Sequence, residues 1–204
     1  YALTGHGETE LDSTYASYIS SENIATNELS LLTADEIPHD CTSILINVPT
    51  SDISADECEK LKKYLDEGGN IILVTGAVTY TSYSMPNITA LCAYMGLESV
   101  DGIVVEGNRN SYLYDPRYLL PVLGTTYDGP LSLLPSSKVY TLMYASHGIL
   151  DIGTHEVTPL MSSTTSAFVK ENFLTDNSVT KSDGDISGMV YVGAAVTGEA
   201  DGTR

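Results

Sequence analysis

The alternation of two hydrophobic periods along the first hundred residues constrains the fold more than any other feature of this sequence. Apolar runs of strand length stand at SILINVP (43–49), NIILVTG (70–76) and GIVVEG (102–107). The first residues, YALT (1–4), have the pattern of the end of a further strand, and between these strands apolar residues recur at helical spacing over 11–22, over 86–96 and in a third segment described below. Strands that alternate with helices of this length predict βαβ units, a parallel sheet and right-handed crossovers. The first half therefore predicts a doubly wound α/β fold.

The helix expected after Ser54 has the clearest local signals. Ser54 and Glu57 have the spacing of a capping box, and Ile53 and Cys58 stand where a hydrophobic staple would lie. Gly68 follows the last turn, as at many helix ends. We expect this helix to begin at Ser54 and to bury Cys58 as a small apolar residue.

The second half of the chain has a different pattern. From about residue 107 the apolar runs are short, mixed and punctuated by Pro and Gly, which is typical of β hairpins and loops. GMVYVGAAV (188–196) then predicts a strand that returns to a sheet. We expect an α/β half over 1–106, a β-rich insertion or lobe over 107–180, and a returning strand with a polar tail over 181–204. Both ends have the pattern of an excised piece of a larger protein.

Charge and cysteine content exclude several classes of function. Nine Lys and Arg residues stand against 27 Asp and Glu, so the formal net charge is -18. Such a charge repels nucleic acid and anionic lipid surfaces. Cys41, Cys58 and Cys92 are far apart and form no CxxC pair, so neither a zinc site nor a disulfide framework is predicted. No apolar run approaches the ~18 residues of a membrane span, and no cofactor is expected.

The candidate site lies at the carboxyl ends of the predicted parallel strands, where ligands of such sheets bind. Three loops follow these ends, at 4–8, 47–54 and 75–81. In the first, two glycines allow a sharp turn, and a histidine and a glutamate could transfer protons or hold an anion. A plain turn with local hydrogen bonds is an equal alternative. The candidate ligand-binding or partner-binding residues are Gly5, His6, Gly7, Glu8, Pro49, Thr50 and Ser51.

Three segments together resemble the gliding-motility-type ABC transporter auxiliary family: LTGHGE (3–8), ILINVPTSDISADECEKLKKYLDEGGNIILVTG (44–76) and VTPLMSSTTSAF (157–168). That family comprises extracytoplasmic domains of membrane proteins that are encoded with ABC transporter subunits. The resemblance implies a flavodoxin-like sheet of the class I glutamine amidotransferase type, similar also to the N-terminal domain of an intraflagellar transport subunit. It implies anchoring through segments outside this sequence. Implied partners are transporter membrane or ATPase subunits, another surface protein, or a small extracellular ligand.

The sequence departs from enzymes of the amidotransferase type at the nucleophile. Those enzymes place a reactive cysteine on a strand-to-helix elbow, whereas this chain has Val48-Pro49-Thr50-Ser51-Asp52 there. We therefore expect a noncatalytic binding module with no catalytic residues. The alternative is a hydrolase or amidotransferase-like enzyme in which His6 and Glu8 activate the hydroxyl of Thr50 or Ser51. The two hypotheses differ in whether His6 reaches either hydroxyl.

The remaining candidates predict no metal site. SDGDISG (182–188) begins like a calcium-binding loop, but Ala194 stands where that loop needs a bidentate glutamate. His39, His147 and His155 are scattered, and we expect them to lie in loops in contact with water.

Overall fold

The computed structural model describes residues 1–77, 82–124, 129–134 and 140–200. The chain divides into two compact units. Unit 1 contains Tyr1–Thr75, Ser82–Leu91 and Gly198–Arg204, and unit 2 contains Gly76–Thr81 and Cys92–Thr197. No helix in the described ranges is both long and apolar enough to cross a membrane.

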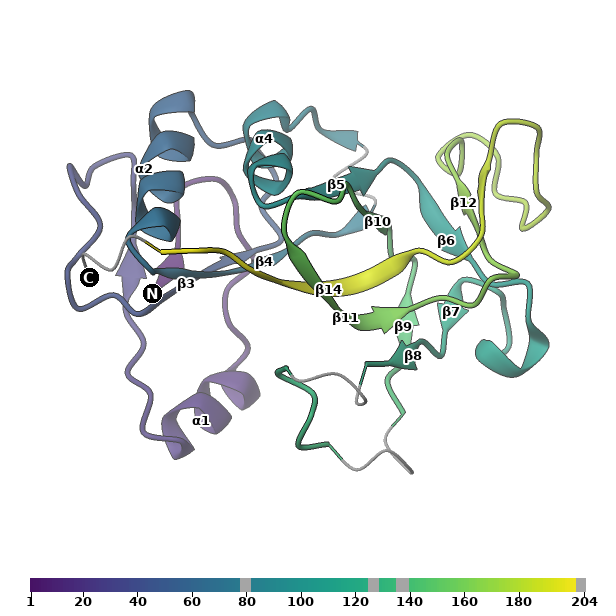
Figure 1. Ribbon diagram of the computed structural model, residues 1–204, viewed down its shortest axis with the longest axis horizontal. Helices are drawn as coiled ribbons and strands as arrows, with labels where there is room; N and C mark the ends of the chain where they lie inside the picture. The colour runs from purple at the N-terminus through teal and green to yellow at the C-terminus, as the bar shows by residue number, and fades with distance from the viewer. Residues whose placement is uncertain (78–81, 125–128, 135–139, 201–204) are drawn as a thin grey trace. The chain divides into compact units, whose positions relative to one another are not determined.

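Unit 1 is built on a parallel sheet of four strands (Figure 1). The strands, in the spatial order β2-β1-β3-β4, are β2 (Glu28–Leu29), β1 (Ala2–Leu3), β3 (Ser43–Asn47) and β4 (Asn70–Val74). Helix α1 (Ser13–Ser21) connects β1 to β2, and α2 (Ala55–Asp66) connects β3 to β4. Helix α4 (Pro86–Tyr94) follows and crosses the boundary between the units. The predicted helices and the strands over 43–49 and 70–76 are therefore confirmed.

Helix α2 begins as its sequence predicts. The Glu57 N–H donates to Ser54 Oγ at 3.3 Å, and the Ser54 N–H donates to Glu57 Oε2 at 2.8 Å, which completes the capping box. The apolar side of the helix, which includes Cys58, is buried. The core of unit 1 consists of Leu3, Leu29, Leu31, Ile37, Cys41, Ile44, Ile46, Ile53, Cys58, Leu61, Tyr64, Met85, Ile88 and Leu91.

The other side of this sheet lacks such a cover. Figure 1 draws α1 and α2 on opposite sides of the strands, as right-handed crossovers in opposite directions require. Yet none of the residues of α1 is buried. On β4, Ile72 is 57% exposed, whereas Ile46 on β3 is 0% exposed. Packed helices therefore cover one face of the sheet and leave apolar side chains of the other face in solvent.

Every strand pairing in the described part of unit 2 is antiparallel. The five-stranded sheet has the order β5 (Leu97–Val100), β10 (Gly148–Asp151), β14 (Tyr191–Thr197), β11 (Glu156–Ser162), β8 (Val122–Leu123). The three-stranded sheet is β13 (Ile186–Ser187), β12 (Phe168–Lys170), β6 (Ile103–Val105), and the two-stranded sheet is β7 (Tyr118–Leu119), β9 (Met143–Tyr144). A 3₁₀ turn, η1, spans Arg109–Ser111. The predicted returning strand is β14, at the centre of the largest of these sheets.

The prediction of a doubly wound parallel fold, flavodoxin-like or glutamine amidotransferase-like, is wrong. Parallel pairing ends with β4, and the remaining described strands form antiparallel sheets. The run at 102–107 forms β6, which pairs with β12 from much later in the chain. A short, fully buried strand is apolar whichever direction its neighbour runs, so its sequence reports burial and not strand direction. Over the described residues the architecture is a mixed one, with four parallel strands and three antiparallel sheets.

Two matched substitutions test the unequal cover of the parallel sheet. We expect Ile46→Ala to lower the free energy of unfolding by about 2 to 5 kcal/mol, because it opens a cavity in a closed core. We expect Ile72→Ala on the neighbouring strand to cost less than about 1 kcal/mol, because that side chain is mostly in solvent. Urea denaturation of both variants measures the difference. Equal losses of unfolding free energy for the two variants would show that the face of the sheet that carries Ile72 is also covered.

Candidate functional site

The loop after β1 has a backbone that only its two glycines allow. Gly5 has φ +120° and Gly7 has φ +71°, in the region that L side chains rarely adopt. A side chain at Gly7 would also collide with the Thr50 hydroxyl. The glycines therefore let this loop turn back beside the loop that follows β3.

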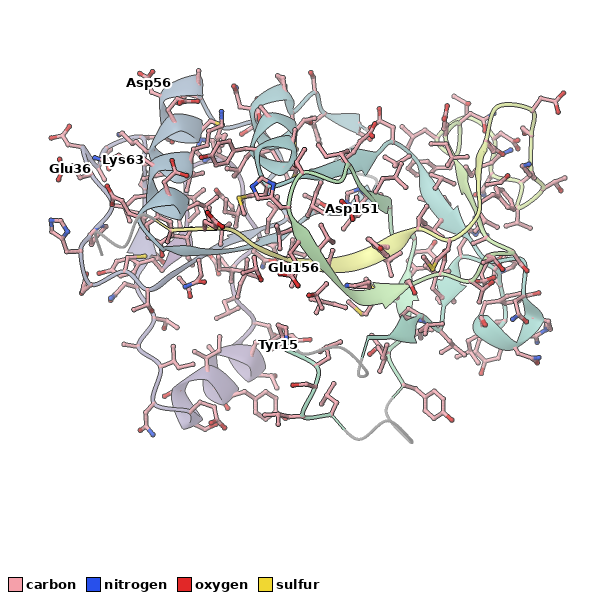
Figure 2. All side chains as sticks on the ribbon, in the orientation of Figure 1. Tyr15, Glu36, Asp56, Lys63, Asp151 and Glu156 are labelled. Atoms are coloured by element: carbon pink, nitrogen blue, oxygen red, sulfur yellow. The ribbon has the colours of Figure 1, made fainter. Side chains whose placement is uncertain are left out.

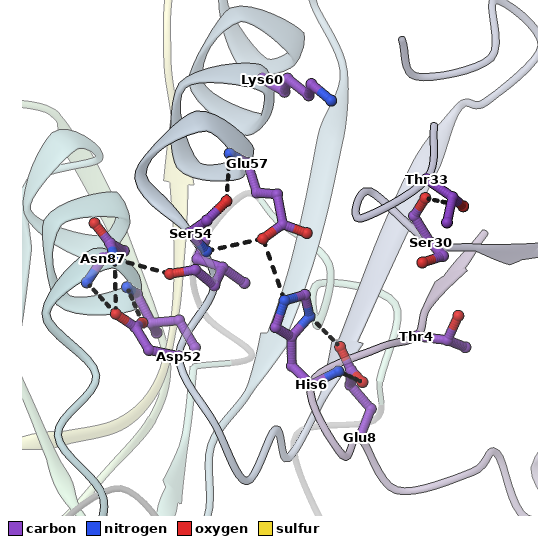
Figure 3. A network of polar contacts seen from close by, with 12 residues as sticks. Thr4, His6, Glu8, Ser30, Thr33, Asp52, Ser54, Glu57, Lys60 and Asn87 are labelled. Carbon is purple, nitrogen blue, oxygen red and sulfur yellow. Dashed lines mark hydrogen bonds and ion pairs between the residues drawn. The ribbon is translucent and has the colours of Figure 1, made fainter. Parts of the chain in front are cut away.

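His6 lies between two carboxylates (Figure 3). Its side chain is 5% exposed. Nδ1 lies 3.3 Å from Glu8 Oε1, and Nε2 lies 3.2 Å from Glu57 Oε2 on the first turn of α2. The His6 backbone N–H also donates to Glu8 Oε2 at 2.8 Å. The imidazole thus joins the loop after β1 to the start of α2.

The two contacts of the imidazole ring can both be hydrogen bonds only in certain protonation states. Both ring nitrogens face carboxylate oxygens, so two hydrogen bonds form only when both nitrogens carry protons or when one carboxyl is itself protonated. Burial acts to raise the pKa of Glu57, but the hydrogen bonds from Ser54 and the charge of the facing His6 together hold it below its usual range. Glu57 Oε1 is buried and has no hydrogen-bond partner within the described residues.

The loop after β3 is bonded to the same histidine through its backbone. The N–H groups of Thr50 and Ser51 donate to the His6 carbonyl at 2.9 and 3.0 Å. The Thr50 hydroxyl donates to the Gly7 carbonyl at 3.3 Å and lies 3.4 Å from the His6 carbonyl. Pro49 is buried beside them. The two loops that the sequence singled out therefore form one hydrogen-bonded unit.

The remainder of the loop between β3 and α2 is also fixed. The Asp52 carboxylate accepts from the backbone N–H groups of Asn87 at 2.9 Å and Ile88 at 3.1 Å, so it caps the start of α4. Val48 has φ +50°, a left-handed conformation that is strained for a β-branched residue. Such strain persists only where surrounding contacts impose it, and here the Val48 N–H donates to the Val74 carbonyl at 2.8 Å.

The structure brings all seven predicted residues into one region and adds one that the sequence analysis missed. Gly5, Gly7, Thr50 and Ser51 are exposed, Glu8 is half-buried, and His6 and Pro49 are buried. The missed residue is Glu57. Its signal was present, because β3 lies next to β1 and the helix that follows β3 must begin near the loop after β1. The third predicted loop, 75–81, falls mostly outside the described residues, at 78–81.

The contacts that the enzyme hypothesis requires are not formed. Both ring nitrogens of His6 face carboxylates, and the Thr50 hydroxyl donates to backbone carbonyls. Within the described ranges no hydrogen bond joins the imidazole to the Thr50 or Ser51 hydroxyl. Of these side chains, that of Thr50 bonds to backbone carbonyls as a turn-stabilising group does, and the imidazole joins the loop to the start of α2.

Unit 2 has its own buried polar groups. The Lys170 ammonium is buried and lies 2.8 Å from Asp176, 2.7 Å from Ser182 Oγ and 3.0 Å from the Thr180 carbonyl. Asp185, from the calcium-like motif, accepts the Ser182 N–H at 2.7 Å and lies 3.9 Å from Lys170. The described residues contain no group of three His, Cys, Asp or Glu side chains that could hold a metal ion.

His147 corrects a further prediction, since it is buried in unit 2, with 6% of its surface exposed. Burial lowers the pKa of His147 to about 4, although Asp101 acts to raise it. The unfolded chain therefore binds a proton below about pH 6.5 that the folded chain binds only below about 4.

We expect His6→Ala to lower the free energy of unfolding at pH 7 by about 3 kcal/mol, because it leaves Glu57 buried without the imidazole that faces it. His39→Ala is the control, because His39 is exposed, and should cost less than about 0.5 kcal/mol. Adding Glu57→Gln to His6→Ala should recover part of the loss, because it removes the buried charge. Urea denaturation measures all three, and equal costs for the two alanine variants would contradict the assignment.

The lowered pKa of His147 predicts that the stability of the fold depends on pH. The stabilisation that comes from a neutral, buried His147 is fully present above about pH 6.5. It is lost as the pH falls toward 4, which lowers the free energy of unfolding by about 3 kcal/mol in total. His147→Gln should therefore have a shallower decline of unfolding free energy between pH 6.5 and 4.5 than the wild type. His155→Gln, at an exposed position, should follow the wild type. Parallel curves for the wild type and His147→Gln would show that His147 titrates equally in both states.

Comparisons with known proteins establish the fold alone. No family model matches the chain, and no curated protein matches it. Among solved structures, the chain is similar to the "mmIFT52 N-terminal domain", with a TM-score of 0.59 and 18% sequence identity over 81% of this chain and 73% of that one. An intraflagellar transport domain is one of the two folds that the family resemblance implies, and the match carries no information on the transporter auxiliary family itself. The chain shares the mixed fold of this domain.

Proposed function

We propose that this chain is a noncatalytic binding domain on the extracytoplasmic side of a membrane-anchored ABC transporter auxiliary protein. The observation that carries the noncatalytic part is the internal use of the His6 imidazole and the Thr50 hydroxyl at the strand ends. His6 is held between Glu8 and Glu57, and the Thr50 hydroxyl is bonded to backbone. A general base must instead face the proton that it removes.

The same contacts favour recognition. Gly5, Gly7, Thr50 and Ser51 are exposed, while the backbone beneath them is fixed by hydrogen bonds to His6. A rigid loop surface loses little conformational freedom when a partner binds, so more of the contact energy contributes to affinity. The strand-end surface, defined as these four residues, is therefore the proposed contact region.

The partner is proposed from the family resemblance and from charge. The resemblance implies a transporter membrane or ATPase subunit, another surface protein, or a small extracellular ligand. The net charge of -18 favours a partner whose contact surface carries Lys and Arg, because complementary potentials speed association and exclude wrong partners.

Binding is tested with the full-length membrane protein and the transporter subunits encoded beside it. We expect Ser51→Arg to weaken their association at least about tenfold, because it places a bulky cation in the strand-end surface. Thr165→Arg adds the same charge at an exposed position of unit 2 and should leave association unchanged. Affinity is measured by co-purification and by titration of the purified components. Equal association for both variants would exclude the strand-end surface.

Catalysis is tested separately on a panel of amide and ester substrates. We expect no turnover above the uncatalysed rate, and no difference between the wild type and His6→Gln. Turnover that disappears with the His6 substitution would overturn the noncatalytic assignment, whatever the binding experiment shows.

A further inference from the structure

Helix α1 carries an apolar face on which two tyrosines are exposed and no residue is buried. Tyr15 is 66% exposed and Tyr18 is 65% exposed. Ile19 on the helix and Leu11 just before it are half-buried and share the helical spacing of the two tyrosines. We call these four residues the α1 face; Figure 2 labels Tyr15 on the helix.

A helix of this kind needs support, and the described part of the chain buries none of its residues. α1 has nine residues, and isolated helices shorter than about 12 residues are marginal in water. The intrinsic helix propensity of its sequence is low, because four of the nine residues are serine and two are tyrosine. Only the cap, in which the Thr14 N–H donates to Asp12 Oδ1 at 2.8 Å, stabilises its start. Helices in proteins owe most of their stability to a packed apolar face, and α1 buries no residue.

The Asp, Glu, Lys and Arg residues that flank α1 in the sequence all have one sign of charge. Residues 1–59 contain no Lys or Arg, and the acidic residues nearest to α1 in the sequence are Glu8, Glu10, Asp12, Glu22 and Glu28. Glu22 is the C-cap, so its carboxylate stands at the negative end of the helix dipole, with no basic residue in the last turn. A cation supplied from outside would be favourable at this end.

These observations decide among the possible occupants of the face. A second copy of the chain would bring a further charge of -18, and an anionic bilayer would be repelled in the same way. A segment with apolar side chains on one side and Lys or Arg beside them can pack against the tyrosines and pair with the carboxylates.

We infer that the α1 face is a docking surface for a basic amphipathic helix of a partner protein. The inference rests on the proposed binding function and names a contact surface and a partner chemistry for it. Docking buries Tyr15 and Tyr18, which contribute large contact area at low entropic cost. It also gives the apolar face of α1 a packing partner, which stabilises the helix. The face is small, so a single helix should bind with a Kd on the order of 10 to 100 µM.

The test uses the 204-residue chain and a synthetic peptide of about 18 residues with Leu on one helical side, Lys on the other and a single Trp. The chain contains no Trp, so tryptophan fluorescence reports the peptide alone. We expect saturable binding that weakens at least about tenfold between about 50 and 500 mM salt. A peptide with Glu in place of Lys, and one with the same composition in scrambled order, should bind at least about tenfold more weakly.

Matched variants separate the α1 face from general attraction between opposite charges. Tyr15→Ser/Tyr18→Ser should weaken peptide binding at least about tenfold, whereas Tyr114→Ser/Tyr140→Ser, at two exposed positions of unit 2, should leave it unchanged. Urea denaturation of both variants checks that the chain still folds. Equal binding by the two variants, or by the ordered and scrambled peptides, would overturn the inference.

Hydrogen exchange supplies a second readout. Amides of α1 should exchange freely in the chain alone and become protected when the peptide is bound. Protection in the monomeric chain alone would show that another part of the chain covers the face, and protection that depends on protein concentration would show a dimer; either result would overturn the inference. Loss of the peptide effect with intact, Ser51-dependent association of transporter subunits would reject the α1 face and leave the proposed function standing.

Discussion

The contact between His6 and Glu57 is the interaction on which the candidate site depends. One oxygen, Glu57 Oε2, accepts the Ser54 N–H at 2.8 Å and lies 3.2 Å from His6 Nε2. The same atom therefore fixes the start of α2 and the position of the loop after β1. Burying an ionic group is unfavourable unless its partners are well placed, and here the other oxygen of Glu57 has no hydrogen bond within the described residues. The arrangement gives a defined loop geometry at some expense of stability.

That geometry determines what the strand ends can do. Because the His6 carbonyl accepts two N–H groups and its ring faces two carboxylates, the histidine has no group left to activate a nucleophile. The exposed residues above it are held in place, which suits recognition of a partner. Helix α1 is the opposite case, since none of its residues is buried within the described part of the chain. Unit 1 thus combines a preorganised surface with a helix that lacks support.

The mixed architecture follows from which apolar surfaces find a neighbour. On β3 and β4, the side chains that face α2 are buried or half-buried, while Ile72 on the other side is exposed. In unit 2 the apolar residues close into antiparallel sheets, and Lys170 and His147 are also buried there. Lys170 is compensated by Asp176 and Ser182, whereas His147 remains neutral over a wide pH range.

The sequence by itself determined the elements whose signals are local. The capping box at Ser54, the apolar runs of β3 and β4, and the glycines around His6 each act within a few residues, so their structures could be predicted. Only the tertiary structure decided which strand β6 pairs with, that α1 buries nothing, and that His6 meets Glu57, 51 residues away. The physical reason is the same in each case. A side chain's pattern reports that it is apolar or polar, but its partner is chosen by competition among distant surfaces, and no local rule encodes that outcome.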